Sequence, residues 1–321
     1  MAVKRGGVQR GNSSWNPLAQ QAGRGKQVGN YIYLYLYLYV SSNSFLLAKK
    51  TGYLKSSTWL NQSYSSTIIQ RLLRMALREK GIPFDMAIPD GLGSGRKISG
   101  LEEANPRMEV PALVDGDFQI FDSKIILQYL EDQYPEYPLL PKDPKSRAEA
   151  RMIEEVCDTG YEAINWGLGE ITWSERATGE LADNLLTQAN TQTKILLDWL
   201  TERLGDKQFF NGDSFGYADI CVAPYVNRSC VYGNGPADGT PLRAWRERVL
   251  EIPSVKQTTG EMQAATQKMA STFKDLFKAG TGRRREYRDH RLEWMIKSGG
   301  FEVVERGLKE DTIRFSWPGG I

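Results

Sequence analysis

The sequence is poor in the residues that carry most enzyme chemistry. Its 321 residues include a single histidine, His290, and three cysteines with no C-x-x-C pair, Cys157, Cys221 and Cys230. This cysteine pattern excludes a disulfide framework and a cysteine-based zinc site. A Ser-His-Asp triad, a Cys-His pair or a histidine-ligated metal would all have to use His290, which lies in a basic stretch near the end of the chain. We therefore expect chemistry that needs neither histidine nor a metal.

Neither sign of charge is in excess. Lys and Arg total 41 and Asp and Glu total 39, so the net charge is only +2. Nucleic-acid binding needs a concentrated basic face, and we expect no nucleic-acid partner. Hydrophobic residues make up 40% of the chain, which is enough for packed cores in about two domains.

Residues 1–60 contain eight Lys or Arg and no acidic residue. The first acidic residue of the chain is Glu79. Residues 31–40 alternate Tyr with Leu or Ile and end in Val. Ten apolar residues are half of what a membrane helix needs, so we expect no membrane partner. We interpret residues 1–60 as a low-complexity basic extension, either disordered or not part of the natural protein. A transit peptide and a functional arm are the alternatives. This interpretation predicts that deleting residues 1–55 leaves folding and ligand binding intact.

The next segment has the pattern of a small α/β domain, which we place at residues 61–134. Apolar spacing predicts a helix over 68–80, with Gly81 ending it. Strands are predicted over 82–88, 110–114 and 118–121, the last two joined by a turn at Asp115-Gly116-Asp117, and a helix over 124–132. A first strand would complete a thioredoxin-like sandwich, and residues 59–62 are a weak candidate for it.

The rest of the chain is predicted to be helical. Pro135, Pro138, Pro141 and Pro144 make residues 135–144 a stiff linker. Residues 145–278 show helical spacing throughout and are predicted to form an all-helical domain. Residues 279–321 form a basic C-terminal extension, and its basic run over residues 283–291 is interpreted as a solvated tail. The expected fold class is α/β plus all-α.

The order of these elements resembles the cytosolic glutathione S-transferases over roughly residues 61–278. The resemblance is carried by residues 70–83, 105–106, 110–113, 122–123 and 211–220. It implies a thioredoxin-like N-terminal domain followed by a helical bundle that holds the acceptor. Residues 283–300 are similar to fungal glutathione-transferase-like proteins encoded beside polyketide genes.

The resemblance also implies a glutathione site. The Val110 backbone would pair with the cysteinyl backbone of glutathione at a cis Pro111. Asp122 and Ser123, at a helix N-terminus, would bind the γ-glutamyl end, with Asp122 standing where the family usually has Glu. A plain strand-initiating proline and an ordinary N-cap are the structural alternatives.

The resemblance implies that a residue at the end of the first strand or the start of the first helix activates the thiol. Counting back from Arg71 gives Ser66 as the hydroxyl that would donate to the glutathione sulfur, with Ser65, Ser63 and Tyr64 as alternatives. The family often has Pro after this position, where this chain has Thr67. No cysteine lies in this window, which disfavours glutaredoxin-like chemistry.

In the bundle, Cys157 is interpreted as a buried structural thiol. Tyr161, Trp166 and Trp173 fit an acceptor wall or simple core packing equally well. Gly216 is predicted to be the N-cap of a helix, and the Asp219 side chain, three residues later, is predicted to accept a hydrogen bond from the Gly216 backbone.

The resemblance thus implies a cytoplasmic, homodimeric enzyme that activates glutathione, its co-substrate, as a thiolate. The predicted acceptor is a small hydrophobic electrophile, for which the fungal resemblance implies an aromatic polyketide intermediate of secondary metabolism. The alternative is a non-catalytic binding or regulatory protein of the same fold.

Overall fold

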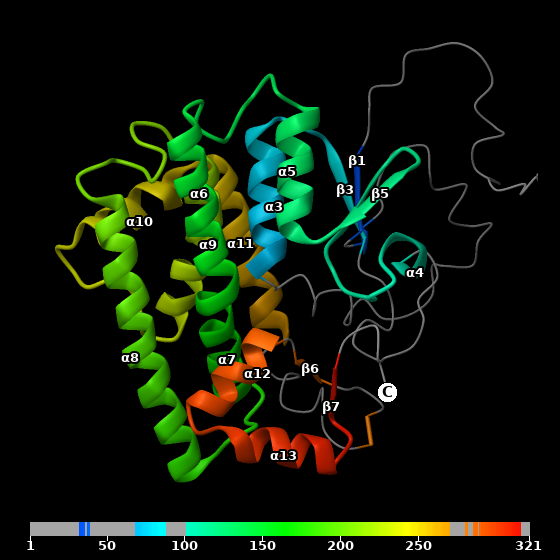
Figure 1. Ribbon diagram of the computed structural model, residues 1–321, viewed down its shortest axis with the longest axis vertical. Helices are drawn as coiled ribbons and strands as arrows, with labels where there is room; N and C mark the ends of the chain where they lie inside the picture. Colours follow the sequence, from blue (N-terminus) through cyan, green and yellow to red (C-terminus); the bar gives the residue numbers. More distant parts are fainter. Residues whose placement is uncertain are drawn as a thin grey trace, which may run out of the picture. The chain divides into compact units, whose positions relative to one another are not determined.

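The computed structural model describes residues 32–35, 37–38, 68–87, 101–269, 280–281, 285–287 and 289–315. Within them the elements follow the order expected for a small sheet domain and then a helical domain (Figure 1). None of the helices in these ranges is long and apolar enough to cross a membrane.

The N-terminal domain is a five-stranded mixed sheet of order β2-β3-β1-β4-β5. Its elements are β1 (Ile32–Tyr35), β2 (Tyr37–Leu38), α3 (Ile68–Glu79), β3 (Phe84–Ala87), α4 (Leu101–Ala104), β4 (Ala112–Asp115), β5 (Phe118–Phe121) and α5 (Ser123–Gln133). The predicted helix over 68–80 and the hairpin of β4 and β5 are confirmed to within two residues.

The first strand comes from an unexpected place. β1 pairs in parallel with β3 and antiparallel with β4, so it lies in the middle of the sheet. The expectation that residues 1–60 are an extension outside the fold is therefore wrong for Ile32–Tyr35 and Tyr37–Leu38. An apolar run without alternating polar residues suits a strand covered on both faces, because neither face needs to be polar. The earlier candidate, residues 59–62, lies outside the described residues.

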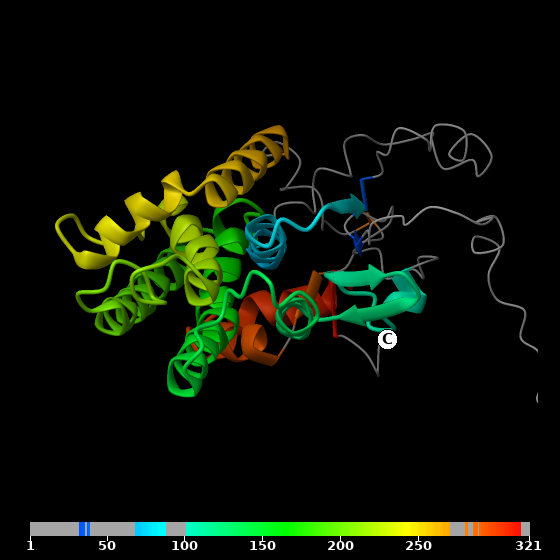
Figure 2. The same ribbon diagram turned by 90° about the horizontal axis from the view of Figure 1, so that it is seen from above.

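Helices α3 and α5 stand between the sheet and the helical domain (Figure 2). The α3 side chains Leu72, Leu73, Met75, Ala76 and Leu77 are almost completely buried in the main core, which continues into the bundle. Because one core includes residues of both domains, the sheet domain is packed firmly on the bundle.

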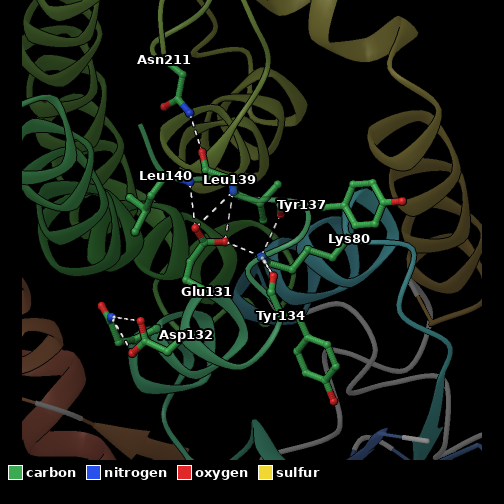
Figure 3. Close-up of polar contacts among 9 residues, drawn as sticks. Lys80, Glu131, Asp132, Tyr134, Tyr137, Leu139, Leu140 and Asn211 are labelled. Atoms are coloured by element: carbon green, nitrogen blue, oxygen red, sulfur yellow. Dashed lines mark hydrogen bonds and ion pairs between the residues drawn. The ribbon is translucent and has the colours of Figure 1, made fainter. Parts of the chain in front are cut away.

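A buried ion pair fixes the connection between the two domains (Figure 3). Lys80 Nζ lies 2.7 Å from Glu131 Oε1 and donates to the carbonyls of Tyr134 and Tyr137. Glu131 in turn accepts from the backbone N–H groups of Leu139 and Leu140. A buried charge is tolerated when it is paired and hydrogen-bonded, as both charges are here. The network holds the end of α3, the end of α5 and the proline-rich segment 134–143 together.

The helical domain follows this segment. It consists of α6 (Pro144–Val156), a π-helical turn η3 (Cys157–Tyr161), α7 (Glu162–Thr172), α8 (Gly179–Leu204), α9 (Tyr217–Val231), α10 (Pro241–Glu251) and α11 (Pro253–Met269). The helical spacing predicted for this part of the chain is confirmed, for example by α9, which runs from Tyr217 to Val231. At its start, the Gly216 N–H donates to Asp219 at 3.1 Å, which confirms the predicted cap.

The C-terminal extension is also part of the fold. It holds β6 (Arg285–Tyr287), α12 (Asp289–Lys297), α13 (Phe301–Lys309) and β7 (Ile313–Phe315). Trp294, Met295, Val303 and Val304 are buried in a second core with residues of α7 and α8. The interpretation of the basic run as a solvated tail is wrong for Arg291, whose side chain is 13% exposed and pairs with Glu162 of α7. The helices α12 and α13 cover an apolar face of the bundle.

Candidate functional site

The β4–β5 hairpin brings the two halves of the predicted site together. Its register pairs Ala112 with Phe121, so the next residues outward, Pro111 and Asp122, stand opposite each other. The Asp122 N–H donates to the Pro111 carbonyl across this gap at 3.4 Å. Residues eleven positions apart in the sequence thus share one edge of the domain.

On one side of the site, the Val110–Pro111 peptide bond is cis, as predicted. Asn105, which is 1% exposed, shapes the loop before it by donating to the Glu109 carbonyl and accepting from the Arg107 N–H. The backbone N–H and C=O of Val110 make no hydrogen bond to another described residue. They are therefore available to pair with an extended ligand backbone.

On the other side, Asp122 caps α5 in an unusual conformation. Its carboxylate accepts from the Lys124 N–H at 3.0 Å, while its backbone has φ 77° and ψ 130°. Positive φ is strained for a residue other than glycine, and such strain is retained mainly at functional sites. Ser123 follows as the first residue of α5, where free N–H groups and the helix dipole favour an anion.

The site is tied to the bundle through Lys124. Its ammonium group pairs with Glu155 of α6 and lies 3.4 Å from Asp158 of η3. Burial acts to lower the pKa of Lys124, but the two carboxylates outweigh it and raise that pKa. The start of α5 is thereby held against α6, next to Glu154, whose buried carboxyl accepts a hydrogen bond from Tyr217 at 2.7 Å.

The remaining predicted residues either lie in the helical domain or fall outside the described residues. Ser66 and its alternatives Ser63, Tyr64 and Ser65 lie outside the described residues, and their role stays a prediction. Cys157 is buried and burial raises its pKa, as expected for an inert structural thiol. Among the three candidate acceptor aromatics, Tyr161 is fully buried in the core, while Trp166 and Trp173 are partly exposed. No group of three or more His, Cys, Asp or Glu side chains in the described ranges is arranged to hold a metal.

Comparison with known proteins bears on the whole arrangement. The N-terminal domain model of glutathione S-transferases matches residues 63–138, and the C-terminal domain model matches residues 185–248. Glutathione S-transferase U28 of Arabidopsis thaliana is 30% identical over 203 residues, which is 61% of this chain and 86% of the relative. This chain belongs to the glutathione S-transferase family. A glutathione S-transferase of Triticum aestivum is 32% identical over 161 residues, 48% of this chain and 70% of that one.

The chain is also similar to relatives with other names and to several solved structures. A stringent starvation protein A homolog of Coxiella burnetii is 27% identical over 213 residues, 66% of this chain and 96% of the relative. The fold matches that of a Tau class transferase from mango, with a TM-score of 0.54 at 24% identity over 65% of this chain and 95% of that one. A transferase from Methylobacterium radiotolerans, solved in complex with glutathione sulfonate, matches with a TM-score of 0.50 and 25% identity over 60% of this chain and 91% of that one.

Two residues that take part in contacts between distant elements, Lys124 and Arg228, were not singled out from the sequence. Lys124 was read only as part of a helix, because its partners are more than thirty residues away. Arg228 was not singled out either, because nothing in its local sequence shows that it lies near α3. In both cases the contacts join segments that are far apart in the sequence. The spacing of apolar residues within one segment does not show which distant segment it will contact.

Proposed function

We propose that this transferase family member binds glutathione at Val110, Pro111, Asp122 and Ser123 and activates its thiol with the Ser66 hydroxyl. The observation that carries the proposal is the hairpin edge, where an unpaired strand backbone and a strained helix N-terminus face one another. The cysteinyl backbone of glutathione would add to the Val110 backbone. The γ-glutamyl carboxylate would lie on the N-terminus of α5, within reach of the Ser123 hydroxyl.

Activation then needs only a hydrogen-bond donor. A free thiol has a pKa of about 8.5 and is mostly neutral at pH 7. A hydroxyl that donates to the thiolate stabilises the charged form and lowers this pKa. The thiolate sulfur would form a carbon–sulfur bond to an electrophilic carbon of the acceptor, after the thiol proton has gone to solvent. In a substitution the leaving group departs with the bonding electron pair, and in an addition the electron pair of the attacked double bond takes up a proton from solvent. No histidine and no metal is required at any step.

The finer expectations stay predictions. They are a cytoplasmic homodimer, a small hydrophobic electrophile as acceptor, and an aromatic polyketide intermediate of fungal secondary metabolism as that acceptor. The relatives named above are plant and bacterial proteins, and none of their names mentions such a pathway.

A second candidate function is that of a non-catalytic glutathione-transferase-fold binding or regulatory protein. The similarity to stringent starvation protein A homologs, which are not named as transferases, favours it. The two candidates differ in turnover, because both allow glutathione to bind.

The test is retention on immobilised glutathione, followed by a conjugation assay with 1-chloro-2,4-dinitrobenzene. We expect the protein to be retained, to elute with free glutathione and to turn over the electrophile. Ser123→Ala should elute earlier, while Ser146→Ala is the matched control, since Ser146 also lies in a first helical turn but bonds only to Asp143. Retention without turnover would favour the second candidate, and loss of both would overturn the proposal.

A further inference from the structure

The buried ion pair of Lys80 and Glu131 leaves its side chains little freedom to move. They are 0% and 4% exposed. The Lys80 ammonium group has three hydrogens, and three acceptors surround it. These are the Glu131 carboxylate at 2.7 Å and the carbonyls of Tyr134 and Tyr137 at 3.0 and 2.9 Å. Glu131 also accepts from two backbone N–H groups of the segment 134–143. A displacement of either side chain would leave buried polar groups unpaired, which is costly.

The pair joins the C-terminal ends of two neighbouring helices, α3 and α5. Lys80 follows the last residue of α3, and Glu131 lies in the last turn of α5. The two helices pack against each other (Figure 1). Helix α5 begins where β5 ends, beside the end of β1, whereas α3 ends where β3 begins. The helices therefore run in the same direction, and their N-termini lie at one end of the sheet domain. At the α-helical rise, the pair lies about 12 Å along α5 from Ser123 and about 18 Å along α3 from Ile68.

These two N-termini correspond to the two ends of the proposed glutathione site. The start of α5 would bind the γ-glutamyl end, and Ser66, which would activate the thiol, precedes the first residue of α3 by two positions. Their separation must match the length of the ligand between these groups. Because an α-helix is stiff along its axis, a shift of α3 along α5 at the ion pair would change this separation by the same amount. A misplacement of about 1 Å can lower a reaction rate about 100-fold.

The apolar contacts between the helices constrain this axial position less strongly. Leu72 and Leu73 of α3 and Ile126 and Leu130 of α5 lie in the main core. Burial of apolar surface is non-directional and changes little when two helices slide by a small distance. A hydrogen-bonded charge pair is directional, and setting the register of packed helices is the best-attested use of buried polar groups. The ion pair is therefore the contact that can fix the register.

We propose that Lys80 and Glu131 are positioning residues that set the axial register of α3 against α5, and with it the distance from the Ser66 hydroxyl to the γ-glutamyl end of glutathione. The pair acts through the two helices and touches neither the ligand nor the reacting atoms. The proposal rests on the proposed function and adds to it the contact that aligns the two halves of the site.

The test is the double variant Lys80→Met/Glu131→Gln, which removes both charges together and keeps an acceptor for the backbone N–H groups. Replacing both partners of a buried ion pair by uncharged residues is often neutral for stability, so urea unfolding should resemble that of wild type. The pKa of the bound thiol, measured by ultraviolet titration, should nevertheless rise toward about 8.5. We expect kcat/KM for 1-chloro-2,4-dinitrobenzene to fall roughly 10- to 100-fold. A purely structural role predicts lower stability and an unchanged thiol pKa in the folded protein, and that result would overturn the proposal.

The matched control is Arg291→Met/Glu162→Gln. This pair is also buried, with side chains 13% and 8% exposed, but it joins α12 to α7. Neither helix carries a residue of the proposed glutathione site, so the thiol pKa should not change. An equal rise in the control would show a general effect of loosening the core and would overturn the proposal. Glu131→Gln alone keeps the hydrogen bonds and serves if the double variant does not fold. It should raise the thiol pKa by a smaller amount, and an unchanged value would count against the proposal.

Failure of this inference and failure of the proposed function are distinguishable. If wild type lowers the thiol pKa and the double variant lowers it equally, the positioning role is overturned while the proposed function stands. If wild type binds no glutathione, or binds it without lowering the thiol pKa, the proposed function fails. The register is then compared directly in crystal structures of wild type and the double variant. A displacement of α3 along α5 by about 1 Å or more would support the positioning role, and an unchanged register would overturn it.

Discussion

The two serines of the proposed glutathione site act on opposite ends of the ligand. Ser123 lies where the γ-glutamyl end would bind, and Ser66 is predicted to face the sulfur. We expect Ser66→Ala to raise the pKa of the bound thiol toward about 8.5 and to lower kcat/KM roughly 10- to 100-fold, because a hydrogen bond to the thiolate is lost. Affinity for glutathione should change little, since the peptide ends are held elsewhere.

Ultraviolet titration of the thiolate in the binary complex measures this effect. Ser65→Ala, Ser63→Ala and Tyr64→Phe are the comparisons. If one of them raises the thiol pKa and Ser66→Ala does not, the role belongs to that residue. An unchanged thiol pKa in all four variants would favour the non-catalytic function.

Substitution of Glu154 should change the free energy of unfolding in a way that depends on pH. Burial raises its pKa to about 7, even though the Tyr217 hydroxyl donates to it. A carboxyl whose pKa is higher folded than unfolded contributes stability below its ordinary pKa of about 4.5, and this contribution is lost as the pH rises through about 7. Glu154→Gln keeps an acceptor for Tyr217 and removes the charge. We expect it to raise the free energy of unfolding at pH 8 by up to about 3 kcal/mol and to change it little at pH 5.

Urea unfolding at the two pH values checks this expectation. Glu202→Gln, on a side chain that is 72% exposed, is the control and should behave alike at both. An equal effect of Glu154→Gln at pH 5 and pH 8 would show that the carboxyl does not titrate in this range.

At the scale of elements, the strand β1 decides how much of the N-terminus the fold needs. Because β1 pairs with β3 on one side and β4 on the other, its removal separates the sheet into two pieces. Contrary to the sequence-based expectation, deleting residues 1–55 should therefore abolish cooperative unfolding of the N-terminal domain and retention on glutathione. A chain that begins at Tyr31 keeps both strands and is the control. Circular dichroism and urea unfolding compare the two, and a stable, glutathione-binding 1–55 deletion would contradict the placement of β1.

The last two helices show a similar dependence on distant partners. Arg291 of α12 pairs with Glu162 of α7 at 2.5 Å, and Trp294 donates to Gln192 of α8 at 2.6 Å. Gly167 allows the close approach, since a Cβ there would lie 2.5 Å from the Trp294 ring. The C-terminal helices are thus built into the bundle by specific contacts rather than by apolar burial alone.

For the whole molecule, we expect a homodimer. The hairpin and α5 expose Phe118 and Ile125, at 46% and 56%, and neighbouring α6 exposes Met152 at 44%. Burying such apolar side chains against a second copy would remove them from water. Light scattering should give twice the chain mass of 36.2 kDa at micromolar concentration. Ile125→Glu should shift the mass toward the monomer, while Ile195→Glu on α8, at 62% exposure, should not. A monomeric wild type would contradict the expectation.

The sequence alone determined the elements whose signals are local. The apolar spacing and Gly81 determine α3, the cap at Gly216 and Asp219 begins α9, and the Asp-Gly turn sets the hairpin. Each of these features depends on residues that are close together in the sequence, so the sequence is enough to predict it. Because the two strands of the hairpin pair with each other, the residues that flank them, Pro111 and Asp122, are brought to one site.

Only the tertiary structure decided the rest. It placed Ile32–Tyr35 in the middle of the sheet and Tyr37–Leu38 at its edge, and it made the C-terminal helices part of the bundle. It also raised the pKa of Glu154 by burying it beside Tyr217, which lies 63 residues away in the chain. Burial and charge interactions depend on distance in space, and segments far apart in sequence meet only when the chain folds.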